Sequence, residues 1–200
     1  MSNVNAPFGL RPVNELSGTP YVGSARTYST PASDATALFV GDLVKLAGTS
    51  QIINGNVYAD VIRAASGDTF VGVVIGCEPD TRDSTQYRAA STARRIIVCD
   101  DPNATFMVQQ SNSGTAFAAN DIGLNCNINV GAGSTVTSMS GTVADNTTGA
   151  TTNTLDLKII GMVNAPDNDV GSSASSGTIA SRLLVRLNRH LLVNQTAGVA

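Results

Sequence analysis

The chain has 200 residues and a formal net charge of −3, and only 14% of its residues are charged. Because an average soluble domain has roughly 25% charged residues, this chain is charge-poor, and its bulk charge does not attract nucleic acid. We therefore expect no nucleic-acid partner. No apolar run reaches the roughly 18 residues of a membrane helix, so we expect no membrane partner either. Hydrophobic residues make up 42% of the chain, which is enough to bury the core of one domain.

The chain begins with an unusual apolar stretch, NAPFGLRPV at residues 5–13. Pro12 lacks a backbone donor, and a proline favours extended geometry in the residue before it, so this stretch is not a helix. It also lacks the basic start and the continuous apolar run of a signal peptide. We therefore predict an extended N-terminal arm over 1–18, a β-rich domain over 19–195 and a C-terminal tail over 196–200.

The side chains of the arm indicate an interface with a partner. Phe8 and Leu10 would fill apolar pockets of that partner, and Arg11 would pair with a carboxylate. Pro7 and Pro12 would reduce the entropy lost when the arm becomes ordered. Alternatively, the arm adds a strand to a partner's sheet, or Phe8 and Leu10 cover the core of their own chain. We favour the partner interface, and expect a chain without residues 1–13 to fold but not to bind.

Strand patterns follow the arm. Residues 36–48 contain two β-prone runs around Gly41-Asp42, and residues 51–62 carry Asn54-Gly55 between two more. Asn-Gly is the strongest short-range hairpin signal, because a type I′ turn needs positive φ at both central positions. Residues 68–79 are nearly continuous Val, Ile and Gly, as in a strand buried on both faces, and glycine there permits a bulge or a close backbone approach.

The remaining chain mixes strand patterns with polar stretches. Ser, Thr, Gly and Asn dominate 111–153, with a short helix possible within 115–122, and we expect a flexible connection at 164–178. The patterns together predict an all-β fold, a compact barrel or sandwich of short antiparallel strands with an extended N-terminal arm and Gly/Ser/Thr-rich loops. Further strands are expected at 84–92, 93–101, 104–110, 124–131, 154–163 and 181–188.

Catalytic patterns are weak in this chain. His190 is the only histidine, and no G-x-S-x-G elbow marks a nucleophile for it to activate. Asp100 and Asp101 are the best other candidates, but carboxylates in this setting are typical of turns. The sequence has neither a phosphate-binding glycine loop nor a zinc-spaced cluster of Cys and His. We therefore expect no catalytic residue, no cofactor and no enzymatic activity.

Metal binding and disulfide bonding are also disfavoured. Asp167, Asn168 and Asp169 offer oxygen ligands, but the rest of a calcium-binding loop is missing, so we interpret them as a solvated turn and expect no metal site. The three cysteines are odd in number and widely spaced, which favours reduced, buried thiols. These cysteines are Cys77, Cys99 and Cys126.

Several segments together resemble a known family. They are NAPFGLRPV, DATALFVGDLVKLAG, GDTFVGVVIGCEPD, QYRAASTARRIIVCDDPNATF and TLDLKIIGMVNAPDND. In this order and spacing, from about residue 5 to about residue 190, they resemble capsid cement (head-decoration) proteins, which are virion structural proteins of tailed bacteriophages. The polar stretches 131–153 and 170–178 add nothing to the resemblance.

The resemblance implies a structural role without catalysis. It implies a β-rich module, made in the cytoplasm of the bacterial host, that binds the outer surface of the icosahedral head in the virion. There it stabilises contacts between subunits of the major capsid protein, and it associates with itself as a trimer or a dimer. Two alternatives remain: a tail-tube or head-fibre virion protein, and a virion-surface carbohydrate-binding module or hydrolase.

Overall fold

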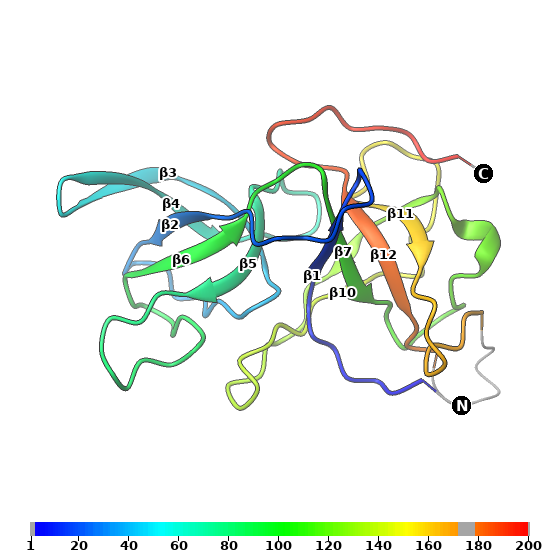
Figure 1. The fold of residues 1–200 in the computed structure, drawn as a ribbon, viewed down its shortest axis with the longest axis horizontal. Coiled ribbons are helices and arrows are strands. Elements are labelled where there is room, and N and C mark those ends of the chain that lie inside the picture. Colours follow the sequence, from blue (N-terminus) through cyan, green and yellow to red (C-terminus); the bar gives the residue numbers. More distant parts are fainter. Residues whose placement is uncertain (1–2, 172–178, 200) are drawn as a thin grey trace.

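Two β-structured parts lie side by side in the computed structural model, which describes residues 3–171 and 179–199 (Figure 1). A closed five-stranded barrel lies on the left, and an open five-stranded sheet lies on the right. The described ranges contain no α-helix, and the short helix predicted within 115–122 is a single 3₁₀ turn, η1 (Ala119–Asp121). The predicted all-β class is confirmed, with a barrel and a sheet in place of one barrel or sandwich.

The barrel closes in the order β2–β4–β3–β5–β6. Its neighbours are antiparallel, except for β2 and β4, which pair in parallel. Asp60 is buried near that parallel contact, where its carboxylate accepts hydrogen bonds from Ser29 (2.6 Å) and Gln51 (2.8 Å). The barrel strands are β2 (Arg26–Thr30), β3 (Leu43–Ile53), β4 (Asn56–Arg63), β5 (Gly72–Cys77) and β6 (Arg94–Cys99).

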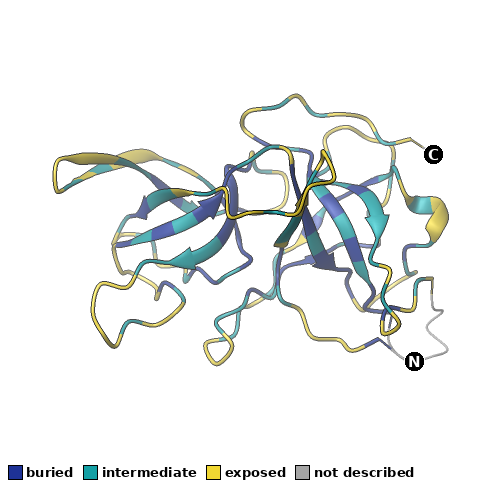
Figure 2. Ribbon diagram, viewed as in Figure 1, coloured by how far each residue is buried: buried dark blue, intermediate teal, exposed yellow. Residues whose placement is uncertain are grey.

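β3 and β4 form a long hairpin that projects from the barrel (Figure 1). Its turn residues Asn54 and Gly55 have φ values of 51° and 80°, and the residues on either side pair directly. The predicted two-residue turn is therefore confirmed. Near the turn, the cross-strand pair Ile52 and Val57 is 75% and 70% exposed, at an end of the hairpin that is largely exposed in Figure 2.

The first half of β5, at residues 72–74, is buried on both faces, as its sequence predicts, whereas residues 75–77 are half-buried. Val74 packs inside the barrel, whereas Val73 belongs to the core beneath the sheet, and both are fully buried. A Cβ atom on Gly72 would lie 2.1 Å from the carbonyl oxygen of Cys99, so glycine permits the close approach of β5 to β6. A bulge also follows Val74 in this pairing.

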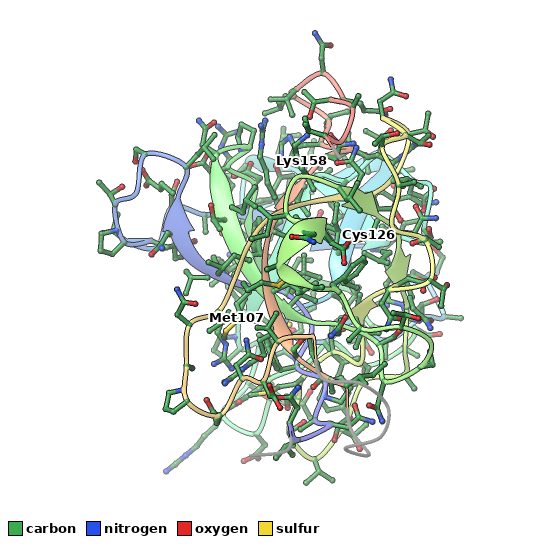
Figure 3. All side chains as sticks on the ribbon, turned by 90° about the vertical axis from the view of Figure 1, so that its right-hand side faces the viewer. Met107, Cys126 and Lys158 are labelled. Atoms are coloured by element: carbon green, nitrogen blue, oxygen red, sulfur yellow. The ribbon has the colours of Figure 1, made fainter. Side chains whose placement is uncertain are left out.

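The sheet has the antiparallel order β1–β7–β12–β11–β8. β1 falls within the predicted arm, so the second half of the arm is an edge strand. Figure 3 faces this side of the molecule, with Met107 of β7, Cys126 of β8 and Lys158 of β11 labelled. The strands are β1 (Arg11–Glu15), β7 (Ala104–Gln109), β8 (Asn125–Cys126), β11 (Leu157–Met162) and β12 (Arg182–Leu187), beside a small pair of β9 (Ile128–Asn129) and β10 (Val143–Ala144).

One of two hydrophobic clusters of the described residues joins the barrel to the sheet, and the other fills the barrel. Phe106 and Val185 on the sheet belong to the same buried cluster as Leu43 and Phe70 on the barrel side. Asp156, which is fully buried, ties the two parts together through hydrogen bonds that its carboxylate accepts from Ser66 and Gly67 near the barrel and from Ile128 of β9. The two parts therefore pack as one unit.

Several predicted strands are shorter than expected or absent. Residues 84–92 form no strand, because the fully buried Arg88 side chain donates hydrogen bonds to the carbonyl oxygens of Pro31 and Thr92 and holds this segment as a loop. The first run of 36–48 makes only isolated bridges, at Leu38 and Val40. The pattern at 124–131 is divided into β8 and β9.

Other boundaries agree with the prediction or lie outside the described residues. The strands expected at 93–101, 104–110, 154–163 and 181–188 correspond to β6, β7, β11 and β12. Residues 1–2 of the arm, 172–178 of the predicted connection and Ala200 of the predicted tail lie outside the described residues.

Candidate functional site

Residues 3–10 of the arm lie extended on their own chain. The side chain of Asn3 exchanges two hydrogen bonds with the backbone of Asp169, at 2.9 and 2.8 Å. Gln109 of β7 accepts a hydrogen bond from the backbone of Ala6 (3.0 Å) and donates one to the side chain of Asn5 (2.7 Å). These contacts hold residues 3–6 of the arm against the sheet side of the molecule.

Two glycines allow the arm to approach the barrel closely. Gly9 has a φ of +73°, and a Cβ atom there would lie 2.5 Å from the carbonyl oxygen of Gly41. Gly41 has a φ of +94°, and its Cβ would lie 2.6 Å from the carbonyl oxygen of Phe8. The backbone of Leu10 donates a 2.9 Å hydrogen bond to Gly41 across this contact. Only glycine combines this backbone conformation with this separation.

The five predicted interface residues have different environments. Leu10 is 2% exposed and belongs to the core under the sheet, so it covers its own chain and is not free to enter a partner's pocket. Phe8 and Pro12 are half-buried, whereas Pro7 and Arg11 are exposed. The structure thus corrects the role of Leu10, and it corrects the expected effect of removing residues 1–13, which would take Leu10 from the core and shorten β1.

A groove of about 270 Å³ runs beside residues 8–12, and we call it the arm groove. One wall is the arm itself, and the other walls come from the barrel and from the loop that contains Met139. Most of the lining side chains are apolar and half-buried. The lining residues are Phe8, Leu10, Arg11, Pro12, Tyr21, Val40, Val74, Ile75 and Met139.

Arg11 is the only formally charged residue of the arm groove. Its guanidinium carbon lies 5.5 Å from the centre of the Phe8 ring, which is within the range of a cation–π contact. Among the described residues, no ion pair includes Arg11. The other polar group, the Tyr21 hydroxyl, donates a hydrogen bond to the backbone of Ser24 at 2.6 Å, and burial raises the pKa of Tyr21. The groove therefore offers apolar contact and one unpaired cation.

The weak catalytic candidates do not form a catalytic arrangement. His190 is 3% exposed, and its Nδ1 accepts a hydrogen bond from the backbone of Leu192 at 3.1 Å. Burial lowers the pKa of His190. Asp100 accepts a 2.8 Å hydrogen bond from Tyr28, whose pKa burial and this hydrogen bond raise to about 12. Asp101 accepts a turn hydrogen bond from the backbone of Asn103. Each of these groups has a local structural partner, although Nε2 of His190 is buried without a hydrogen-bond partner.

The candidate metal ligands and the cysteines also have structural environments. Asn168 is buried, and its side chain bonds to the backbone of Val163 and Arg182, while Asp167 forms an ion pair with Arg182. No cluster of three or more His, Cys, Asp or Glu side chains suited to a metal occurs within 3–171 and 179–199. The cysteines carry free thiols whose pKa burial raises, and they are buried except for the half-buried Cys77.

The arm groove includes residues that sequence reasoning missed. Tyr21, Val40, Ile75 and Met139 come from separate segments, and no local pattern places them together. The one local signal was glycine in NAPFGLRPV and in LFVGDL, because Gly9 and Gly41 meet at the edge of the groove. The exposed hairpin pair at residues 52 and 57 was also missed.

Comparisons with known proteins provide no family assignment for this chain. Comparison of the chain with protein families, with curated proteins and with solved structures finds no match. No helix within the described ranges is long and apolar enough to span a membrane.

Proposed function

We propose that this chain is a non-enzymatic capsid cement protein of a tailed bacteriophage virion. It binds the outer surface of the icosahedral head, contacts the major capsid protein and stabilises contacts between its subunits. It acts as a self-associated unit, a trimer or a dimer. The observation that carries this proposal is the arm groove, an apolar surface with an unpaired Arg11, on a chain whose sequence resembles cement proteins over most of its length.

The construction of the chain suits this role physically. Packed DNA pushes the shell outward, so a cement protein must resist separation of the subunits that it joins. The barrel and the sheet share a core, and buried carboxylates reinforce their junction: Asp156 as described above, and Asp42, which accepts a hydrogen bond from Ser140 at 2.5 Å. A rigid unit loses little conformational entropy on binding, and many copies on one head add their weak contacts together.

The test uses heads that lack this protein. Purified full-length chain is added to expanded heads, and binding is followed by sedimentation and by a low-resolution reconstruction. We expect saturable binding at a fixed number of copies on the outer surface, and a higher temperature of head disruption. Full-length chain that does not bind heads at micromolar concentration would contradict the proposal.

A tail-tube or head-fibre role is the second candidate, and the projecting hairpin favours it. Ile52 and Val57 present exposed apolar side chains at the end of that hairpin, as a protein that assembles by stacking copies requires. In that case the purified chain polymerises by itself, and the reconstruction finds it in the tail or in fibres. Glycan binding by the chain, with unchanged head stability, would instead favour a carbohydrate-binding module.

A further inference from the structure

We propose that the arm groove is a socket that receives one aliphatic or aromatic side chain of a capsid-shell protein, next to a carboxylate of that protein that pairs with Arg11. The arm then forms a wall of the binding site on its own chain, and the partner supplies the inserted group. This reverses the direction expected from the sequence, in which Phe8 and Leu10 insert into the partner. The inference rests on the proposed function, because that function supplies the partner.

The lining of the groove favours an apolar side chain as its occupant. The groove has a volume of about 270 Å³, and most of its lining residues are apolar. Its lining has one charged side chain, and the hydroxyl of Tyr21 already donates to Ser24. Such a groove can bury an apolar anchor, the kind of contact that dominates protein–protein affinity.

The charge of the groove favours a carboxylate beside that anchor. The lining residues include no Asp or Glu, and no ion pair of the described residues involves Arg11. The contact between Arg11 and the Phe8 ring holds the guanidinium beside the groove. An arginine guanidinium binds a carboxylate through two parallel hydrogen bonds, which fixes the orientation of the partner as well as adding affinity.

The groove is also formed before a partner binds. Asn3 and Gln109 hold the arm by side-chain hydrogen bonds, and the contact between Gly9 and Gly41 fixes the backbone at the groove. Leu10 anchors the same segment in the core. Because the wall is already ordered, binding does not have to order a loose arm.

A peptide titration tests the socket without heads. The probe is acetyl-Leu-Glu-amide, added to isotope-labelled full-length chain, and backbone NMR signals are followed. We expect saturable shifts in the millimolar range at residues 8–12, 75 and 139, and at least several-fold weaker binding of acetyl-Leu-Gln-amide and acetyl-Ala-Glu-amide. Shifts that do not saturate, or that fall elsewhere, would overturn the inference.

Head binding of two charge-reversal variants provides the second test. Arg11→Glu should weaken binding about tenfold or more, while Arg82→Glu, the same charge change at an exposed residue outside the groove, should bind like the unchanged chain. Equal binding of both variants would overturn the socket while the proposed function stands. If Arg11→Glu instead alters only self-association, a second copy occupies the groove and the inference is wrong. If the unchanged chain does not bind heads, the proposed function fails and the peptide titration decides the socket.

Discussion

Gly9 and Gly41 form a contact that no other residue pair can make at this distance. Replacing Gly9 with Ala would place a Cβ atom 2.5 Å from the carbonyl oxygen of Gly41 while φ remains at +73°. Both the left-handed conformation and the overpacking cost free energy, so we expect the free energy of unfolding to fall by about 2–4 kcal/mol. Urea denaturation of the full chain measures this loss.

Gly23 provides a matched control for that substitution. It has a φ of +90°, and a Cβ there would meet nothing within 4 Å, so Gly23→Ala incurs only the conformational cost of about 1–2 kcal/mol. The difference between the two variants isolates the contact of the arm with the barrel. If Gly9→Ala is no more destabilising than Gly23→Ala, the arm does not pack against Gly41 in solution.

His190 makes the stability of the fold sensitive to acid. Burial lowers its pKa below the ordinary value of 6.5; the nearby Asp100 opposes this shift, and Arg186 adds to it. The folded state therefore binds fewer protons than the unfolded state near pH 6. The stabilisation is complete above about pH 6.5 and is lost as the pH falls towards the pKa of the folded state.

The variant His190→Asn tests this effect, because an amide oxygen can accept the hydrogen bond from Leu192 without titrating. We expect the stability difference between the two proteins to change in favour of the variant as the pH falls from about 7.5 to about 5. Denaturation in urea at each pH gives this difference, and the carboxylates common to both proteins cancel. A difference that does not depend on pH would show that His190 is not buried as a neutral group.

At the scale of the elements, we expect the exposed end of the β3–β4 hairpin to affect the association of copies more than folding. Ile52 and Val57 form an exposed cross-strand pair, so the double substitution Ile52→Thr and Val57→Thr should change the free energy of unfolding by no more than about 1 kcal/mol. Removing this apolar surface should weaken self-association if the hairpin lies in the interface between copies. Sedimentation velocity at several concentrations measures the change. An unaltered oligomeric state would place the interface elsewhere.

The hairpin and β5 also show what local sequence can predict. Asn54-Gly55 specifies its turn through its own backbone preferences, and the Val and Gly pattern of β5 specifies burial on both faces. The strand predicted at 84–92 is wrong because its conformation depends on distant partners: Arg88 bonds to the backbone of Pro31, and no property of residues 84–92 reveals that contact. Structure that depends on neighbouring residues in the sequence was predictable, whereas structure that depends on contacts between distant segments was not.

The candidate site follows the same rule. Prolines and apolar residues predicted the extended arm, and four of the five proposed residues, all except Pro7, line the arm groove. Their role was predicted less well, because Leu10 packs into a core that is assembled from strands far along the chain. The opposite wall, at Val40, Ile75 and Met139, exists only after the barrel and the sheet have packed together.

At the scale of the whole molecule, Asp156 joins the barrel to the sheet. Its carboxylate is fully buried and accepts hydrogen bonds from Ser66 (2.7 Å), Gly67 (2.9 Å) and Ile128 (3.1 Å), while the Arg189 guanidinium lies 3.9 Å away. Asp156→Ala leaves the buried backbone N–H of Ile128 without an acceptor and removes the hydrogen bonds from the exposed Ser66 and Gly67, so we expect a loss of about 1–3 kcal/mol in the free energy of unfolding.

The control Asp101→Ala removes only the turn hydrogen bond to Asn103, so it should cost at most about 1 kcal/mol. Because Asp156 lies between the two parts, its loss should also uncouple them, and thermal unfolding of Asp156→Ala should broaden or divide into two transitions. Calorimetry of both variants tests this coupling. A single sharp transition at an unchanged temperature would mean that the shared core alone holds the barrel and the sheet together.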